Sequence, residues 1–415
     1  MHQLNIALAV IAAVVVLIGL FSRPIKKSPV QEPMIAVFVG IAVGPYGFGW
    51  LDMAKWGEES PILEQAARIT LAIGLMGVAL RLEKESVKAL WRPVTLLLTL
   101  GMLGMWLVSS ALAGFLLGVS FWTALLLGAV VTPTDPVVAS SIVTGPFAKK
   151  HLPLRVRDAI SLEAGANDGL AYLFVMLSVL MIGHSPDEAW SRWLVESVLV
   201  GVMVAGIIGC AIGYAAARLL AVARRRGIAE NASLLGYTVA FSLLTLGVSA
   251  LARADAIISV FLAGLVFNVC TEGGEEHEEE HIQEAVAKLF TLPMFVLFGI
   301  ALPFSEWMRL GWPLFALTIL ILLLRRPPVV AALSPTLRNA LNGRDAAYIG
   351  WFGPVGVAAI YYATFARGHV HDPMIWHVAS AVIFASILVH GATAATLTRL
   401  YARHPLPAPP ATKDL

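Results

Sequence analysis

Thirteen apolar stretches run through the chain, most of them about as long as a helix that crosses a lipid bilayer. Backbone polar groups find no water inside lipid, so such stretches cross it as helices that satisfy their own hydrogen bonds. With 58% hydrophobic and 13% charged residues, and a mean hydropathy of +0.79, the composition exceeds that of a soluble domain. The sequence therefore predicts an all-α polytopic membrane protein with thirteen transmembrane helices, at residues 4–22, 31–50, 62–80, 93–116, 121–145, 158–183, 192–217, 232–250, 255–271, 286–303, 310–330, 344–366 and 374–398.

Lys and Arg side chains are distributed unevenly between the loops. Loops after odd-numbered stretches, with the C-terminal tail, hold 20 of the 29 basic residues, whereas loops after even-numbered stretches hold five. Cytoplasmic loops of membrane proteins are the ones enriched in Lys and Arg. We therefore expect a multi-pass protein of the cell (inner) membrane, with its N-terminus outside and its C-terminus in the cytoplasm. The asymmetry also supports the count of thirteen, because one missed stretch would abolish it.

One segment predicted to be cytoplasmic is acidic instead of basic. Residues 270–285, CTEGGEEHEEEHIQEA, contain the H-E-x-x-H pattern of zinc proteases at His277, Glu278 and His281. A zinc protease needs this helix packed on a core with a third ligand, and the segment has no apolar face. We expect a solvated loop over 272–284, with sensing of cytoplasmic pH or cations by the two histidines as the alternative.

The stretch VVTPTDPVVASSIVTG, residues 130–145, places a carboxylate between two prolines inside an apolar span. Pro133 and Pro136 lack backbone donors, so the helix should break near residues 132–136. A broken helix survives at membrane depth where its freed backbone is buried in protein or lines a cavity, and there it can hold an ion. Asp135 is therefore a candidate site residue; the alternative is a structural kink in which it caps the second half-helix.

A second interruption is predicted in GWFGPVGVAAIYY, residues 350–362, by Gly353, Pro354 and Gly356. The two interrupted spans hold corresponding positions in two groups of six, which indicates inverted repeats crossing at a shared site. We expect one transmembrane unit, residues 1–402, followed by a short disordered tail at 403–415. Within that unit the first repeat covers 4–183, a connector helix 192–217 and the second repeat 232–398.

Other ionisable residues also lie inside the apolar spans. Glu163 and Asp168 occur in DAISLEAGANDGLAYLFVML, and Arg325 and Arg326 end another span. Charges at membrane depth cost several kcal/mol unless they are paired or face water, so they mark functional sites by default. The two acids lie about 140° apart on a helix, so they can face different partners. The arginines are the nearest candidates for pairing.

TPTDPVVASSIVTG and EAGANDG together resemble the monovalent cation:proton antiporter-1 family, specifically the NhaP-type sodium/proton antiporters. The resemblance covers about residues 4–400. It implies an NhaA-like fold with two inverted six-helix repeats, a homodimer in the lipid bilayer, and alternating access. It also implies a transporter rather than an enzyme, and we expect no cofactor. The net charge of +2 gives no bias toward nucleic acid.

The resemblance assigns roles to individual positions. Asp168 looks like the carboxylate that binds either the cation or a proton. Asp135 and Thr134 look like its companions around Na⁺. Thr132 belongs to the supporting backbone, and Asn167 stands where electrogenic relatives have a second Asp.

Further support comes from an ion pair that the resemblance implies. Glu163 looks like the acid that pairs with an arginine, which we place at Arg326 with Arg325 as the alternate. The family often has Ser where this chain has Ala164, so one ligand is missing and the choice between Na⁺ and K⁺ stays open.

These residues predict a secondary transporter that exchanges Na⁺, with Li⁺ or K⁺ as further candidates, for H⁺. A carboxylate in a partly desolvated pocket favours its protonated form and a nearby cation favours the ionised form, so the two ions compete for Asp168. Asn167 cannot titrate, which predicts electroneutral exchange of one cation for one proton. Alternatives are a K⁺/H⁺ antiporter, a Na⁺-coupled organic anion symporter of the same fold, an intramembrane aspartyl protease and a transport-inactive cation sensor.

Overall fold

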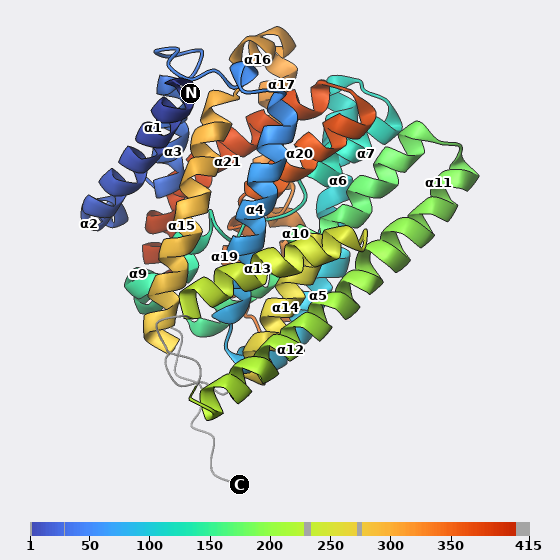
Figure 1. The fold of residues 1–415 in the computed structure, drawn as a ribbon. Helices are drawn as coiled ribbons and strands as arrows, with labels where there is room; N and C mark the ends of the chain where they lie inside the picture. Colours follow the sequence, from blue (N-terminus) through green and yellow to red (C-terminus); the bar gives the residue numbers. More distant parts are fainter. Residues whose placement is uncertain (1, 29, 228–233, 272–275, 404–415) are drawn as a thin grey trace.

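The computed structural model describes residues 2–28, 30–227, 234–271 and 276–403, and within these ranges it contains helices and no strand. Figure 1 shows long helices that cross one another at steep angles. The helices are α1 (His2–Leu20), α2 (Ser22–Lys27), α3 (Glu32–Val43), α4 (Glu59–Leu80), α5 (Lys84–Leu96), α6 (Met102–Leu117), α7 (Phe121–Val130), α8 (Ser140–Val143), α9 (Gly145–His151), α10 (Leu154–Gly183), α11 (Pro186–Arg192), α12 (Ala205–Arg225), α13 (Leu234–Leu251), α14 (Ala256–Cys270), α15 (Glu276–Ile300), α16 (Phe304–Leu310), α17 (Trp312–Leu324), α18 (Pro327–Leu337), α19 (Gly343–Trp351), α20 (Val357–Val370) and α21 (Met374–Ala402).

Two wider π-helical segments join pairs of these helices into longer ones. Leu97–Gly101 connects α5 to α6, and Trp193–Val204 connects α11 to α12. Every predicted apolar stretch overlaps a helix or a pair of helices with a break between them, although the helix in the stretch 31–50 ends at Val43. Among the described residues, six helices are long and apolar enough to cross a membrane by themselves, or seven if α15 and α16 count as one bent span. The all-α membrane fold is thus confirmed, and the count of thirteen crossings stays a prediction.

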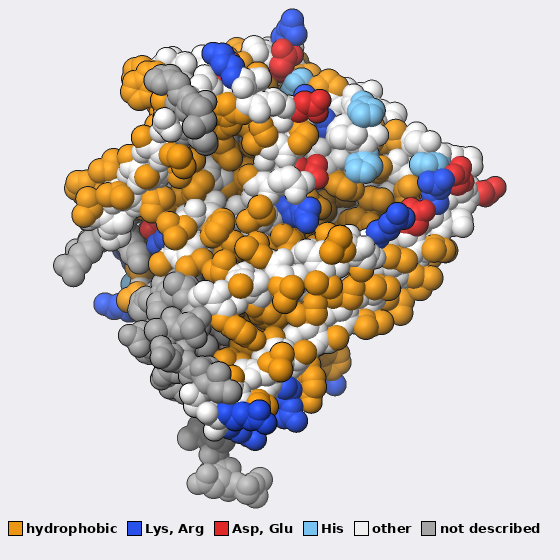
Figure 2. Space-filling model, in the orientation of Figure 1, with side chains coloured by type: hydrophobic (Ala, Val, Ile, Leu, Met, Phe, Trp, Pro, Cys, Tyr) orange, Lys and Arg blue, Asp and Glu red, His pale blue; other side chains and the backbone are white. Residues whose placement is uncertain are grey.

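Burial separates central helices from peripheral ones. The apolar windows of α4 and α21 are each 67% buried and that of α10 is 61% buried, whereas the window in the long α11–α12 helix is only 22% buried. In the orientation of Figure 2, hydrophobic side chains cover much of the outer surface of α12 and α13, and basic side chains gather beyond one end of that surface. The site must therefore be sought around α4, α10 and α21, behind this outer layer.

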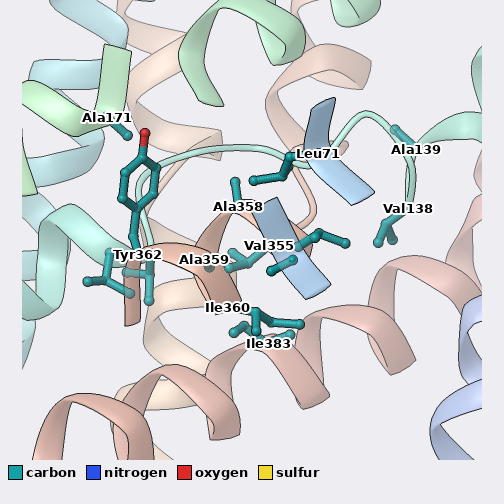
Figure 3. Packing of buried hydrophobic residues seen from close by; sticks show 14 of the residues in the cluster. Leu71, Val138, Ala139, Ala171, Val355, Ala358, Ala359, Ile360, Tyr362 and Ile383 are labelled. Carbon is teal, nitrogen blue, oxygen red and sulfur yellow. The ribbon is translucent and has the colours of Figure 1, made fainter. Parts of the chain in front are cut away.

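Figure 3 shows how the first turns of α20 fill the centre of the molecule. Val355, Ala358 and Ile360 are at most 1% exposed. They lie among Leu71 of α4 and Ile383 of α21, and Tyr362 points its hydroxyl toward the helix that carries Ala171. This apolar packing surrounds the second predicted helix interruption.

The prediction of a solvated loop over 272–284 is wrong for its second part, because α15 begins at Glu276. Glu, Gln and Ala are good helix formers, and they extend the membrane helix outward once its apolar part is fixed by packing. Residues 272–275 lie outside the described residues, and so do the side chains of 276–284. The roles considered for His277, Glu278 and His281 therefore stay untested.

Close packing between α3 and α15 depends on two glycines. A Cβ on Gly299 would lie 2.2 Å from the carbonyl oxygen of Val37, and one on Gly40 would lie 2.2 Å from that of Val296. Both contacts are with backbone, so no side chain can move aside. Hydrogen at these positions allows the two helix backbones to touch, as small residues do in other membrane proteins.

We predict that Gly299→Ala lowers the stability of the protein by about 1–3 kcal/mol, because α3 and α15 must separate. Gly247→Ala is the control, since nothing lies within 4 Å of a Cβ at that position in α13, and it should be neutral or stabilising by up to about 1 kcal/mol. The measurement is the apparent melting temperature in detergent. Equal melting temperatures for the two variants would contradict the packing of α3 on α15.

Candidate functional site

The first predicted helix break lies where the prolines place it. α7 ends at Val130, and the chain does not become helical again until Ser140, at the start of α8. Pro133 and Pro136 cannot donate backbone hydrogen bonds, so a continuous helix would lose two of its links. Thr132 ends α7 locally, because its Oγ1 donates to the carbonyl oxygen of Gly128 at 2.8 Å.

The second break separates α19, which ends at Trp351, from α20, which begins at Val357. The two non-helical segments cross each other, because the backbone N–H of Asp135 donates to the carbonyl oxygen of Pro354 at 2.8 Å. Both interruptions predicted from proline and glycine are therefore confirmed, and so is their meeting. The crossing brings four half-helix ends into one buried region.

Asp135 satisfies the amino-terminal ends at this crossing. Its Oδ1 accepts from the backbone N–H groups of Val137 at 2.6 Å and Val138 at 3.3 Å. Its Oδ2 accepts from the N–H of Val357, the first residue of α20. A carboxylate at helix amino termini is stabilised by their partial positive charge. The capping contacts considered for Asp135 are thus observed, at the first residue of α20 and in the turn that leads into α8.

Gly356 makes the approach of Asp135 possible. A Cβ at this position would lie 2.0 Å from Asp135 Oδ2, which is inside the contact distance of any two heavy atoms. Gly353 has the same role toward the other charge, since its Cβ would lie 2.2 Å from Cδ of Arg326. The glycines that marked the break in the sequence therefore also make room for two charged side chains.

Arg325 satisfies the carboxyl-terminal ends. Its Nη1 donates to the carbonyl oxygens of Val131, Thr132 at 3.2 Å and Pro133 at 3.3 Å, after α7. Its Nη2 donates to the carbonyl oxygen of Gly353, after α19. From the sequence, Arg325 was predicted only as the alternate partner for Glu163. Its position as a cap for both broken helices was missed, because the residues it touches lie far away in the chain.

Arg326 forms the predicted pair with Glu163. Nη1 and Nη2 each donate to one carboxylate oxygen at 2.9 Å, and the two side chains are 3% and 1% exposed. The Nε of Arg326 donates to the carbonyl oxygen of Ile349 at 2.9 Å. This two-point geometry is the one in which a buried ion pair compensates its loss of water.

Asn167 connects this ion pair to the first break. Its Oδ1 accepts from the backbone N–H of Thr134 at 3.0 Å, and its Nδ2 donates to Thr134 Oγ1 at 2.7 Å. The same Nδ2 donates to Glu163 Oε1 at 2.8 Å. The amide therefore fixes the orientation of Thr134, and an aspartate at this position could not donate both bonds.

Asp168 differs from every other charged residue of the site. Its side chain is fully buried, at 0% exposure, and neither carboxylate oxygen has a hydrogen-bond partner among the residues that the structure describes. Only its backbone is held, since Tyr362 donates to its carbonyl oxygen at 2.6 Å. An unsatisfied buried carboxylate is costly, and such groups call for a bound ion or proton.

The structure thus gathers all eight candidate residues around one crossing. Tyr362, Gly353 and Gly356 are among the further residues that contact these candidates directly. Gly356 was legible in the sequence as part of the break. Tyr362 could not be predicted, because a single tyrosine in an apolar helix gives no pattern that distinguishes a packing residue from one that hydrogen-bonds to the site. The site residues are Thr132, Thr134, Asp135, Glu163, Asn167, Asp168, Arg325 and Arg326.

Comparison with known proteins adds a family, relatives and a fold. Residues 9–400 match the family described as sodium/hydrogen exchanger, transmembrane. The chain is 29% identical to "Na(+)/H(+) antiporter 2" of Zygosaccharomyces rouxii, over 95% of this chain and 52% of that protein. It is 25% identical to "K(+)/H(+) antiporter NhaP" of Alkalimonas amylolytica, over 94% of this chain and 66% of that protein. The chain spans about half the length of the first curated relatives it matches.

A solved structure shares the fold. The sodium proton antiporter MjNhaP1 of Methanocaldococcus jannaschii superposes with a TM-score of 0.72 at 17% sequence identity, covering 97% of this chain and 100% of that chain. The predicted antiporter fold is thereby confirmed.

We predict that Glu163→Gln destabilises the protein by about 3–5 kcal/mol, because it leaves the buried guanidinium of Arg326 without its counter-charge. The double variant Glu163→Gln/Arg326→Met removes both charges and should recover part of that loss. The measurement is the apparent melting temperature of the two single variants and the double variant, read as a double-mutant cycle. Additive effects would show that the two side chains do not stabilise each other.

Proposed function

The chain belongs to the sodium/hydrogen exchanger family, and from this we propose that it is a secondary transporter that exchanges Na⁺ for H⁺ across the membrane. The names of its relatives support the cation and the proton as substrates. The observation that carries the proposal is the carboxylate of Asp168, buried and without a partner among the described residues. Either a proton or a cation would satisfy it, and both cannot do so at once.

Competition for one carboxylate gives the exchange its mechanism. A bound Na⁺ displaces the proton by attraction to the ionised carboxylate, and a proton displaces Na⁺ by removing that charge. The empty site carries an uncompensated charge, which opposes its movement through a low-dielectric region. The site then changes sides only when it is loaded, and this condition makes transport of one ion depend on return of the other.

Charge counting supports a stoichiometry of one to one. Asp135, Glu163 and Asp168 contribute three negative charges, and Arg325 and Arg326 contribute two positive charges. The site therefore has one net negative charge, which a single Na⁺ or a single H⁺ neutralises equally. Asn167, which cannot titrate, adds no further proton. We propose electroneutral exchange on this basis.

Thr134 and Asp135 complete the proposed cation site. Thr134 Oγ1 is buried, and Asn167 uses only one of its lone pairs. The backbone carbonyl oxygen of Thr134 is the second proposed ligand from this residue, since the carbonyl oxygens of Thr132 and Pro133 already accept from Arg325. Asp135 already receives three backbone N–H groups, so its contribution to the cation is electrostatic more than direct.

Potassium is the second candidate cation, and one observation favours keeping it. Ala164 is 1% exposed and adjoins Glu163 on α10, so the site lacks a hydroxyl ligand there. Fewer fixed oxygens favour the ion that is easier to dehydrate. The relative named as a K⁺/H⁺ antiporter shows that the family includes such proteins. Li⁺ belongs in the same comparison.

The remaining expectations about the assembled protein are also proposals. We propose a homodimer in the cell membrane, with alternating access, an outer N-terminus and a cytoplasmic C-terminus. The uneven distribution of Lys and Arg between loops supports this orientation. The exposed apolar surface of α12 lies against lipid or a second copy (Figure 2).

The decisive experiment measures proton flux in reconstituted vesicles with a pH-sensitive dye when Na⁺, Li⁺ or K⁺ is added. We expect cation-evoked flux that does not change when the membrane potential is clamped, because each cycle moves no net charge. The relative size of the proton flux evoked by each of the three ions gives the cation selectivity. Silence with all three ions, in protein shown to be folded, would overturn the proposal.

Asp168→Asn should reduce this flux to the background of empty vesicles. The substitution removes the titrating group and breaks no side-chain hydrogen bond, so the free energy of unfolding should change by no more than about 1 kcal/mol. Asp187→Asn, at an exposed position of α11, is the control and should transport normally. Cation-dependent proton flux in Asp168→Asn would refute the role of this carboxylate.

Thr134→Ala should raise the cation concentration for half-maximal flux by about tenfold and change the maximum rate less, because it removes one oxygen ligand and no charge. Thr364→Ala is the matched control. That threonine is also buried, but its hydroxyl bonds within α20 to Ile360 and Tyr361. A lower maximum rate at unchanged half-saturation would contradict a role in binding.

A further inference from the structure

His390 of α21 lies beside the second helix break and contacts both of its sides. The imidazole Nε2 is 3.2 Å from the carbonyl oxygen of Trp351, the last residue of α19. Nδ1 is 3.0 Å from Ser386 Oγ. Ser386 Oγ in turn accepts from the backbone N–H of Val355 at 2.7 Å, inside the break. A chain of hydrogen bonds therefore leads from the end of α19 through His390 to the segment before α20.

The hydrogen-bond partners of the two ring nitrogens favour one neutral tautomer. Each nitrogen lies near a carbonyl oxygen, which only accepts, but only Nδ1 also lies near a hydroxyl group, that of Ser386. With the proton on Nε2, this nitrogen donates to the carbonyl oxygen of Trp351. In the neutral ring Nδ1 is then an acceptor, and the Ser386 hydroxyl can donate to it while its oxygen accepts from Val355. One tautomer thus satisfies the whole chain. The carbonyl oxygen of Ser386, also 3.0 Å from Nδ1, becomes a partner only if Nδ1 gains a proton.

The backbone of the same break also contacts the two charged side chains, Arg325 and Asp135, that bond to the crossing segments. Gly353 accepts from Arg325, and the N–H of Val357 donates to Asp135. Each of these backbone groups is two residues from a group held by the histidine chain. A displacement of the break would therefore move the contacts of both charged side chains.

We propose that His390 is a positioning residue for cation exchange, which acts through Ser386 and the backbone of residues 351–357 on Asp135 and Arg325. This inference rests on the proposed function. The ring is buried, at 5% exposure, and packs beside Trp351 and Phe352 with centroid distances of 5.6 and 6.5 Å. If His390 served packing alone, any aromatic ring would suffice, whereas the chain of hydrogen bonds requires both ring nitrogens of His390.

The neutral tautomer also connects this position to pH. A proton added at Nδ1 converts that nitrogen from acceptor to donor, so the Ser386 hydroxyl has to turn away. The charged groups in electrostatic contact with the ring are Arg325 and Arg326, and both are already positive. A charged ring would therefore be repelled by the arginine that caps α7 and α19.

Four variants separate positioning from packing. His390→Phe keeps a ring and removes both hydrogen bonds, and Ser386→Ala removes the link to Val355. His390→Gln keeps an amide that can donate to Trp351. Ser380→Ala is the matched control, because Ser380 is also a fully buried serine on α21, but its hydroxyl contacts Trp376 and Trp307, away from the break.

The readouts are the Na⁺ concentration for half-maximal proton flux, the maximum rate and the pH profile. We expect His390→Phe and Ser386→Ala each to raise the Na⁺ concentration for half-maximal flux by about fivefold, with a smaller change in maximum rate. Their double variant should be no worse than either one, since both break the same chain. His390→Gln should recover part of the loss, and His390→Phe should shift the pH profile. Half-saturation and pH profiles like those of Ser380→Ala would overturn the inference.

Hydrogen–deuterium exchange of the peptide covering 351–357 decides the question independently of transport. The amide of Val355 should exchange about tenfold faster in Ser386→Ala and His390→Phe than in Ser380→Ala. Unchanged exchange in both variants would overturn the inference even if their transport is altered. If the wild-type protein transports none of the three cations, the proposed function fails, and this measurement still shows whether His390 holds the break.

Discussion

The structure depends on compensating four half-helix ends inside a low-dielectric interior. Two helices that stop and restart at membrane depth expose backbone donors and acceptors that water cannot satisfy. Asp135 accepts from the first N–H of α20 and from the turn that leads into α8, and Arg325 donates to carbonyl oxygens that follow α7 and α19. Each charge is stabilised by the ends that it caps and has the sign that their dipoles favour. Neither charge would be tolerable at this depth without the breaks, nor the breaks without the charges.

This compensation extends to every carboxylate of the site except one. Glu163 is neutralised by Arg326, and Asp135 is occupied by three backbone N–H groups. Asn167 holds Thr134 without adding charge. Asp168 is left with neither hydrogen bond nor counter-charge among the described residues. The surroundings are rigid and satisfied, so the unsatisfied group is also the one whose state can change without disturbing the fold.

The elements of this site were legible in the sequence to different degrees. Proline and glycine change the backbone at their own positions, so both breaks could be predicted from local chemistry. The pairing of Glu163 with Arg326 could be predicted because few opposite charges exist inside the spans. The role of Arg325 could not be predicted, because it depends on carbonyl oxygens more than 190 positions away in the chain. It also depends on which of two adjacent arginines points toward them, and the sequence does not distinguish the two. The helical start of α15 was missed because a run of Glu indicates exposure to water, and both a loop and a helix can be exposed to water.

Packing of α14 against α10 holds the part of α10 that carries Asp168. A Cβ on Gly165 would lie 2.3 Å from the Phe261 ring, and one on Gly169 would lie 2.3 Å from the Ile258 side chain. Asp168 lies between these two glycines on α10. Any movement of α10 along α14 would have to separate these two contacts, in which large side chains fill the space that the glycines leave. The small residues that let the two helices approach therefore also hold in position the segment that carries Asp168.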